Sequence, residues 1–220
     1  MPSFREQVEM LESWRRFPGV ERLADDRVAL TFDDGPDPDA TPAILDALDA
    51  AGAKATFFVV GEQLMRHHAI ARAARARGHE LALHGATHPH LERLSPAAAR
   101  DEIARGVGAF EAAVGERPAL FRPPYGRFGE HAFAACRRFD LTPVYWSAWG
   151  GDWDPLPAER IAELAARDLS AGAIVLLHDS ARYATRASAA PTAAAVAPIA
   201  AAAAEAGLAI GPVAGPPYGG

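Results

Sequence analysis

Short runs of apolar, β-branched and aromatic residues alternate with longer segments of helical composition along this chain of 220 residues. Such runs, bounded by Gly, Pro or charged positions, are typical of buried strands. The pattern predicts seven strands, over residues 28–32, 55–60, 80–83, 119–121, 142–146, 174–177 and 208–210.

Helix start and stop signals lie between these runs. Helices are predicted to begin at Thr41 and Ser95, each of which precedes a proline, and to end at Gly52 and near Gly115. Three more are predicted over 62–77, 157–170 and 192–206, each ending close to a glycine. Pro198 falls inside the last of them, and we expect it to kink that helix or to split it in two.

Strands and helices alternate throughout the chain. This order requires an α/β fold with a largely parallel sheet and helices outside it, either a barrel or a doubly wound sheet. A chain of this length is expected to fold around one core. We assign residues 1–27 to an N-terminal helical extension and residues 28–215 to the α/β domain.

Charge and composition exclude several classes of partner and of metal site. The 22 Lys and Arg residues against 28 Asp and Glu leave a net charge of −6, so no nucleic acid partner is expected. Cys136 is the only cysteine, which excludes an internal disulfide and leaves His and carboxylate for any metal site. No stretch reads as an integral membrane segment or a secretory signal, so we expect the chain, if full length, to be cytoplasmic. The oligomeric state is left open.

Polar residues follow the predicted strands at their ends. The segments concerned are Asp33-Asp34, His84 to His88, Arg122 to Tyr125, Asp152-Trp153 and His178-Asp179. In a parallel α/β barrel the carboxyl ends of all strands meet at one rim, where active sites are built. We therefore expect these distant segments to converge.

Asp33 and Asp34 are adjacent carboxylates at the end of the first strand. Neighbouring side chains of an extended strand point to opposite sides, so one aspartate can bind a metal while the other moves a proton. The alternative is a solvated turn, because Asp and Gly are common turn residues.

His84 and His88 are four residues apart, a spacing that suits a zinc site completed by one carboxylate. Pro89 disfavours a helical backbone at His88, so the pair is expected on a loop or an irregular turn. An incidental pair of surface histidines is the alternative.

Arg122 and His178 each follow a predicted strand and each needs a partner if it is buried. Asp33 is the expected carboxylate for Arg122, since a bidentate pair would keep Asp33 ionised and aimed. Asp152 is the expected partner of His178, whose pKa it would raise so that His178 can act as an acid. The alternatives are a surface arginine in a turn and a core histidine bonded to the backbone.

These motifs, taken in order, are similar to those of a known family. The segments Thr31 to Pro36, His84 with His88, Arg122 to Gly126, Asp152-Trp153 and Leu176 to His178 resemble the polysaccharide deacetylases of the NodB-homology type, carbohydrate esterase family 4. The resemblance covers about residues 28–213. It implies a distorted, incomplete (β/α)7 barrel with parallel strands and outer helices.

The resemblance also implies roles for individual residues. Asp34, His84 and His88 would bind a divalent metal, usually zinc, with cobalt or nickel as alternatives. Asp33 would be the general base with Arg122 as its tether, and His178 the general acid with Asp152 behind it. The backbone N–H of Tyr125 would hold the oxyanion, and Trp153 and Leu176 would wall the acetyl pocket.

Two positions depart from the family pattern. Gly85 stands where members usually have Ser or Thr, so the loop loses a bracing hydroxyl, and metal affinity or loop order is expected to suffer. Trp149 stands where many members have an acidic residue; it would either stack on a sugar or fill core volume.

The resemblance predicts a metal-dependent hydrolase that removes the acetyl group from an N-acetylated amino sugar in an oligo- or polysaccharide. One alternative keeps the class but changes the substrate, as a deformylase or deacetylase of a lipid-linked sugar or a cyclic-amide hydrolase. Another is a carbohydrate-binding pseudoenzyme. Retention of Asp33, Arg122 and His178 favours catalysis, because a pure binder need not keep proton carriers.

Overall fold

The computed structural model describes residues 4–214. Residues 1–3 of the predicted extension and residue 215, the predicted end of the domain, lie outside this range. A seven-stranded parallel sheet has the strand order β5-β4-β3-β2-β1-β7-β6. The strands are β1 (Ala29–Asp33), β2 (Thr56–Val59), β3 (Glu80–Leu83), β4 (Leu120–Phe121), β5 (Thr142–Pro143), β6 (Ala148–Trp149) and β7 (Ile174–His178).

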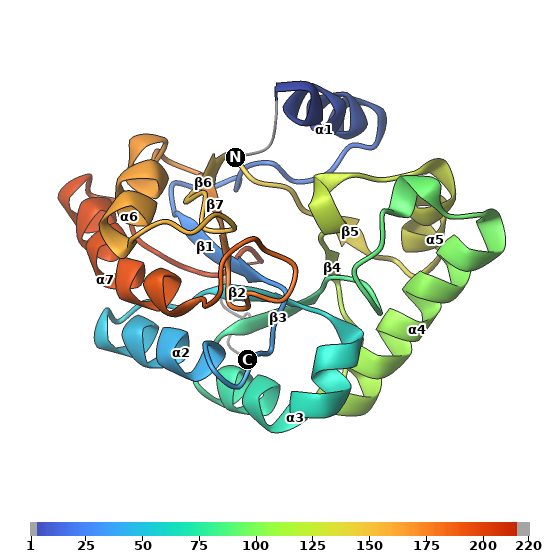
Figure 1. Ribbon diagram of the computed structural model, residues 1–220, viewed down its shortest axis with the longest axis horizontal. Coiled ribbons are helices and arrows are strands. Elements are labelled where there is room, and N and C mark those ends of the chain that lie inside the picture. Colours follow the sequence, from blue (N-terminus) through green and yellow to red (C-terminus); the bar gives the residue numbers. More distant parts are fainter. Residues whose placement is uncertain (1–3, 215–220) are drawn as a thin grey trace.

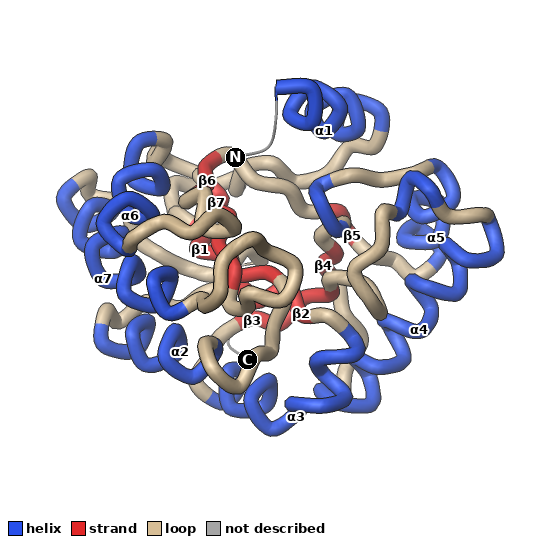
Figure 2. Tube along the Cα trace, viewed as in Figure 1, coloured by secondary structure: helices blue, strands red, loops and turns tan. Residues whose placement is uncertain are grey.

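Within residues 4–214, seven α-helices surround the sheet, which lies at the centre (Figures 1 and 2). They are α1 (Phe4–Arg16), α2 (Thr41–Ala50), α3 (Gly61–Ala76), α4 (Pro96–Val114), α5 (Glu130–Arg138), α6 (Ala158–Arg167) and α7 (Ala190–Glu205). Two short 3₁₀ turns, η1 (Leu91–Arg93) and η2 (Pro124–Gly126), follow β3 and β4. Between residues 4 and 214 no helix is long and apolar enough to cross a membrane.

The sheet curls into an incomplete barrel, which confirms the predicted fold class. Its order ends at β5 on one side and at β6 on the other. The chain between α1 and β1 runs across this opening: Val20 pairs with Val144 beyond β5, and Arg22 pairs with Ala173 just before β7. The N-terminal segment is therefore part of the barrel wall.

The predicted ends of α4 show how local signals set the elements. The Ser95 hydroxyl accepts a hydrogen bond from the N–H of Ala98 at 3.3 Å and so caps the helix start. Gly115 ends the helix with a φ of 86°, a left-handed conformation that glycine adopts without strain.

Several elements differ from the expectation. Residues 208–210 form only one bridge, from Ile210 to Val28, because the residues of β1 that follow Val28 pair with β7 and β2 instead. The predicted strand 142–146 stops after Pro143, and β6 is a separate strand. Helix α5 was not predicted. Pro198 was expected to kink α7 or to split it in two; the helix is not split, since packing on α2 and α6 outweighs the one lost backbone hydrogen bond.

Helix α1 is anchored in the core by two aromatic residues. Trp14 and Phe17 are 6% and 7% exposed and belong to the same hydrophobic core as the strands. The Trp14 ring stacks on Tyr145 at 4.6 Å between centroids and meets Trp146 edge-on at 5.0 Å. Its indole N–H donates to the carbonyl of Gly126 at 2.8 Å. Helix α1 and Phe17 therefore pack against the barrel as part of the same core.

Replacing Trp14 by Ala should lower the free energy of unfolding by about 3–5 kcal/mol, because a large buried ring leaves a cavity. Leu11→Ala on the same helix is the matched control; Leu11 is 47% exposed, and its loss should cost no more than about 0.5 kcal/mol. Urea unfolding measures both. A Trp14 variant as stable as the Leu11 variant would contradict this packing.

Candidate metal and active site

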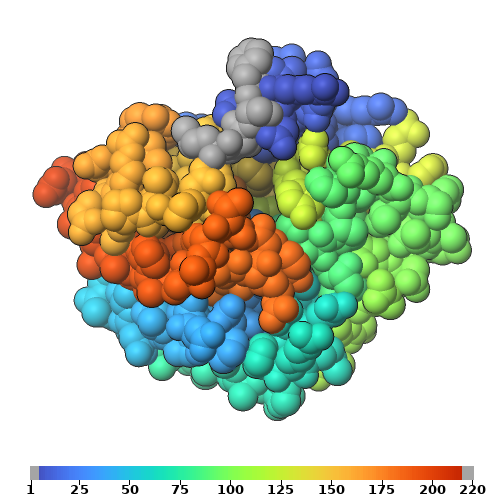
Figure 3. Space-filling view, in the orientation of Figure 1, coloured from blue at the N-terminus to red at the C-terminus, as the bar shows by residue number. Residues whose placement is uncertain are grey.

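A pocket of about 460 Å³ opens at the carboxyl ends of the strands. Its lining includes Asp33, Asp34, His84, His88 and His178, which stand at or just after the ends of β1, β3 and β7. The surface is hollowed between α1 and the chain that follows β7 (Figure 3). The structure thus brings these strand ends together, as expected.

Asp33 is held by a buried guanidinium. Arg122 donates from Nη1 to Asp33 Oδ1 at 2.8 Å and to the Thr31 hydroxyl at 2.7 Å, and it is fully buried. Burial raises the pKa of the Asp33 carboxyl, and the charge of Arg122 opposes this rise. The second oxygen, Oδ2, lies 3.8 Å from Nε2 of His84. The expected bidentate pair is thus a single contact, which leaves the second carboxylate oxygen of Asp33 facing the pocket.

Asp34 points to a different side of the pocket. Its φ of 85° lies in the left-handed region, which non-glycine residues rarely adopt, so the backbone turns sharply after β1. Its Oδ1 is buried, accepts no hydrogen bond from the described residues, and lies 3.5 Å from Nε2 of His84 and 3.4 Å from Nε2 of His88.

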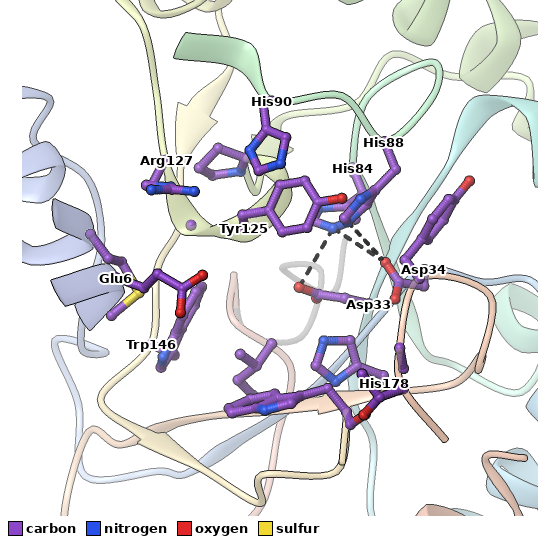
Figure 4. Close-up of a pocket in the computed structure, with 18 of the residues that line it drawn as sticks. Glu6, Asp33, Asp34, His84, His88, His90, Tyr125, Arg127, Trp146 and His178 are labelled. Carbon is purple, nitrogen blue, oxygen red and sulfur yellow. Dashed lines mark hydrogen bonds and ion pairs between the residues drawn. The ribbon is translucent and has the colours of Figure 1, made fainter. Parts of the chain in front are cut away.

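His84 and His88 present Nε2 to Asp34 (Figure 4). The Nδ1 of His84 is 2.8 Å from the carbonyl oxygen of Arg122, so Nδ1 carries the proton and Nε2 keeps its lone pair. Burial lowers the pKa of His84 to about 3 and the pKa of His88 to about 2. Both rings are therefore neutral and able to coordinate a cation.

The three side chains fit a divalent metal. Their ligand atoms lie within 4.8 Å of one another. Donors bound at about 2.0–2.1 Å around a tetrahedral zinc are about 3.4 Å apart, close to the 3.4 and 3.5 Å separations found here. Burial raises the pKa of Asp34 to about 7, so its ionised form needs a nearby cation. A divalent cation bound by the two neutral imidazoles and by the unpartnered Asp34 oxygen would meet that need.

His178 faces this cluster across the pocket (Figure 4). Its Nδ1 is 2.8 Å from Asp152 Oδ1, and its backbone N–H donates to Asp152 Oδ2 at 2.9 Å. Burial alone would lower the pKa of His178, but the charge and hydrogen bond of Asp152, together with the charges of Asp34 and Asp33, raise the pKa to about 9. At neutral pH His178 is therefore a cation.

Two residues that the sequence pattern did not single out support Asp152. The Thr192 hydroxyl donates to Asp152 Oδ2 at 2.7 Å, and Arg186 Nη1 lies 3.3 Å from the same oxygen. Arg186 also donates to the carbonyls of His178 and Ser180, at 2.9 and 3.1 Å. Burial would raise the pKa of Asp152, but these partners and His178 keep it below its usual value.

Asp179 is used structurally. Its carboxylate accepts from the N–H of Gly35 at 2.8 Å and from the Thr41 hydroxyl at 2.6 Å. A Cβ at Gly35 would lie 2.0 Å from Asp179 Oδ2, so the turn after the two aspartates requires glycine. This bond joins the end of β7 to the turn that carries Asp34.

Of the other residues expected in the pocket, three line it and one does not. Tyr125, Trp153 and Leu176 all line the pocket, and Trp153 meets the His178 ring edge-on at 5.8 Å. Trp149 is in β6 and packs against the core outside the pocket lining, whereas Trp146 lines the pocket. Trp149 ends β6 yet lies outside the lining, so a position at a strand end does not by itself bring a side chain into the cavity.

Further lining residues come from segments that the motifs did not cover. Tyr183, after β7, stacks on the His88 ring at 4.2 Å, and His90 stacks on Tyr125 at 4.1 Å. Glu6, Gln7 and Met10 of α1 line the opposite side, where Figure 4 shows Glu6 beside Trp146 and Arg127. Position in three dimensions is the only signal that identifies them.

The geometry of a buried Asp-His-His cluster beside a tethered aspartate and a histidine-aspartate pair defines a metal-dependent hydrolase class. The polysaccharide deacetylase family model matches residues 21–144. The chain belongs to the polysaccharide deacetylase family. A chitooligosaccharide deacetylase of Bradyrhizobium sp. (strain ANU 289) is 39% identical over 153 residues, which cover 69% of this chain and 70% of that protein. A peptidoglycan-N-acetylglucosamine deacetylase of Bacillus cereus is 36% identical over 155 residues, or 69% and 72% of the two chains.

Solved structures agree with this assignment. A family 4 carbohydrate esterase from Streptomyces lividans in complex with acetate is 35% identical, with a TM-score of 0.77 over 84% of this chain and 92% of that one. A peptidoglycan N-acetylglucosamine deacetylase bound to an N-oxidanyl-benzamide is 27% identical, with a TM-score of 0.83 over 91% and 94%. A mutant of a pseudoenzyme of the same family, with restored enzymatic activity, also matches at 26% identity and a TM-score of 0.79, over 88% and 69%.

Purified protein should bind one zinc ion per chain, measured by calorimetry after removal of bound metal. Asp34→Ala and His88→Ala each delete a ligand and should weaken binding by more than the roughly 10- to 100-fold typical of residues behind the ligands. His68→Ala is the control, because His68 is exposed on α3. Equal zinc affinity in all three variants would place the metal elsewhere.

Proposed function

We propose that this protein removes the acetyl group from N-acetylglucosamine units of an oligo- or polysaccharide, releasing acetate and leaving a free amine. The observation that carries the proposal is the meeting of three features in one pocket. These are the Asp34, His84 and His88 cluster, the Asp33–Arg122 pair and the His178–Asp152 pair. Relatives named chitooligosaccharide and peptidoglycan-N-acetylglucosamine deacetylases support the substrate class.

Asp34, His84 and His88 are the proposed metal ligands, and zinc is the proposed metal. A bound divalent metal would polarise the acetyl carbonyl and lower the pKa of a water toward about 7. Histidine nitrogen and carboxylate oxygen are ligands that zinc accepts, and cobalt or nickel would accept the same set.

Asp33 is the proposed general base. Arg122 holds Oδ1, and Oδ2 faces the pocket beside the ligand His84, so that Oδ2 can take the proton of the water that attacks the acetyl carbon. Burial raises the pKa of this carboxyl, which makes it a stronger base than a solvated aspartate.

His178 is the proposed general acid. An amine is a poor leaving group unless its nitrogen is protonated, and the cationic His178 can supply that proton. Asp152 keeps the imidazole charged and fixes Nδ1 as the proton donor to Asp152, which leaves Nε2 to face the substrate. Asp33 and His178, the two proposed proton carriers, are register partners on the neighbouring strands β1 and β7.

The oxyanion and acetyl contacts are proposed for three further residues. The backbone N–H of Tyr125, held at a φ of 57° in η2, would donate to the developing oxyanion. One such fixed donor is typically worth about 3–4 kcal/mol of transition-state stabilisation. Trp153 and Leu176 line the pocket beside His178 and would wall the methyl group.

Zinc-loaded enzyme should release acetate from N-acetylglucosamine oligomers, and Asp33→Asn should lower kcat by about 10²–10⁴-fold because the base is lost. A chelator should abolish the activity, and added zinc should restore it. Acetate release that survives both the substitution and the chelator would contradict the mechanism. Glycan binding without any turnover by the zinc-loaded wild type would favour a pseudoenzyme.

His178→Asn separates the acid from the rest of the site. It should lower amide turnover by about 10²–10⁴-fold but leave hydrolysis of 4-nitrophenyl acetate largely intact, since a phenolate leaves without a proton. Equal loss on both substrates would instead indicate a damaged pocket.

The pH profile tests Asp152. Because His178 must be protonated and its pKa is about 9, kcat for the amide should fall as pH rises through about 9. Asp152→Asn removes the charge that raises this pKa, so the alkaline fall should move to lower pH. A profile with an unchanged alkaline limb would exclude Asp152 as the partner that sets the acid.

A further inference from the structure

The turn from His84 to His88 is held by backbone contacts to α3. The N–H groups of Gly61 and Glu62, at the start of α3, donate to the carbonyls of Gly85 and Ala86, both at 2.9 Å. The N–H of His84 donates to the carbonyl of Val59 at 2.9 Å. These bonds fix the first half of the turn and leave its second half, which leads to His88, to other contacts.

Helix α4 supplies those contacts through Glu102. This glutamate is only 3% exposed, and Oε1 accepts from the N–H of Thr87 at 2.7 Å while Oε2 accepts from the Thr87 hydroxyl at 3.0 Å. Arg105, one turn later, donates to Oε2 at 3.1 Å. The buried Glu102 carboxylate thus accepts three hydrogen bonds, two of them from Thr87, the residue immediately before the ligand His88.

Two glycines make this close approach feasible. A Cβ at Gly106 of α4 would lie 2.9 Å from the backbone nitrogen of Ala86, so only glycine lets the helix reach the turn. A Cβ at Gly85 would lie 3.0 Å from Glu102 Oε1 and 2.9 Å from the Thr87 carbonyl oxygen, and the φ of Gly85 is 94°. Gly85 therefore clears the space that the Glu102 carboxylate occupies.

We propose that Glu102 is a positioning residue for the metal ligand His88, acting through Thr87. The proposal rests on the proposed metal site. It reverses the expectation that the absence of a hydroxyl at position 85 leaves the loop without a brace. The brace comes from the hydroxyl and the N–H of Thr87, both received by one carboxylate of α4.

The bonds explain why a carboxylate is needed at this position. The N–H and the hydroxyl of Thr87 are two donors that point the same way, and one carboxylate can accept both at once. A leucine would leave this partly buried N–H without its acceptor, so the turn would have to open to satisfy it. His88 would then move relative to Asp34 and His84.

The experiment compares zinc affinity in Glu102→Leu, Glu102→Gln and Asp101→Asn. Asp101 precedes Glu102 on α4, is 65% exposed and pairs with the same Arg105, so it controls for lost charge. Zinc dissociation constants from chelator competition should rise about 10- to 100-fold for Glu102→Leu, as for other partners behind a metal ligand. The rise should be smaller for Glu102→Gln, whose amide oxygen still accepts one bond, and absent for Asp101→Asn.

Visible absorption of bound Co²⁺ gives a second readout, because its bands depend on ligand geometry. Glu102→Leu and Glu102→Gln should change the spectrum, and Asp101→Asn should not. Thermal unfolding of each metal-free variant identifies any loss of fold; if Glu102→Leu does not fold, Glu102→Gln carries the test. Wild-type zinc affinity and an unchanged cobalt spectrum in folded Glu102 variants would overturn the proposal.

Gly85→Ser tests whether the turn needs a hydroxyl at position 85 or is already held by Glu102. Serine at a φ of 94°, with its Cβ against Glu102 and Thr87, should weaken zinc binding. Tighter zinc binding in this variant would show that the turn lacks a brace and would contradict the proposal. Wild-type protein that binds no zinc would overturn the metal site and the role of Glu102 together. Tight zinc binding without deacetylation would contradict the proposed function but leave the role of Glu102 intact.

Discussion

The fully buried guanidinium of Arg122 is the interaction on which the rest of the site depends. It donates to Thr31 and Asp33 of β1 and, from its other nitrogens, to the carbonyls of Val144 and Tyr145 at 3.4 and 2.8 Å. Its plane also lies over the Phe58 ring at 4.0 Å. A charge buried this deeply is tolerated only with partners on every side, so Arg122 joins β1, β4 and the chain beyond β5. The aim of Asp33 follows from that constraint.

Neighbouring groups give chemically identical side chains different roles. Asp33 and Asp34 are adjacent, yet one faces Arg122 and the other faces two imidazoles. The side chains of His84, His88 and His178 are 3%, 6% and 13% exposed, but only His178 has a hydrogen bond to a carboxylate, which helps to raise its pKa despite burial. The pocket therefore holds two neutral rings for a metal and one charged ring for a proton. The same residue type, histidine, thus serves both purposes, and its surroundings decide which.

Much of this arrangement could be predicted from the sequence, because it depends on strand ends. Asp33, His84, Arg122 and His178 each follow a short apolar run, and a parallel sheet brings such positions to one rim. Residues that act from a helix could not be found in the same way. Glu102 and Asp101 are adjacent acids on an amphipathic helix, and only the packing of α4 determines which one is buried.

The remaining differences have local causes. Trp146 and Trp149 differ little as sequence positions, but the backbone path between β5 and β6 brings only Trp146 to the pocket. Pro198 carries a helix-breaking signal that tertiary packing overrides in α7. Residues 208–210 have strand composition, yet only Ile210 pairs, because β1 beyond Val28 pairs with β7 and β2. Arg186 reaches Asp152 from a loop whose course no periodicity describes.

Anomalous diffraction at the zinc absorption edge, from crystals of zinc-loaded protein, is the most direct measurement of the central claim. The account predicts one strong peak within bonding distance of Asp34, His84 and His88, with Asp33 still paired to Arg122 and outside the coordination sphere. A peak coordinated by Asp33, or one found away from these three residues, would contradict it.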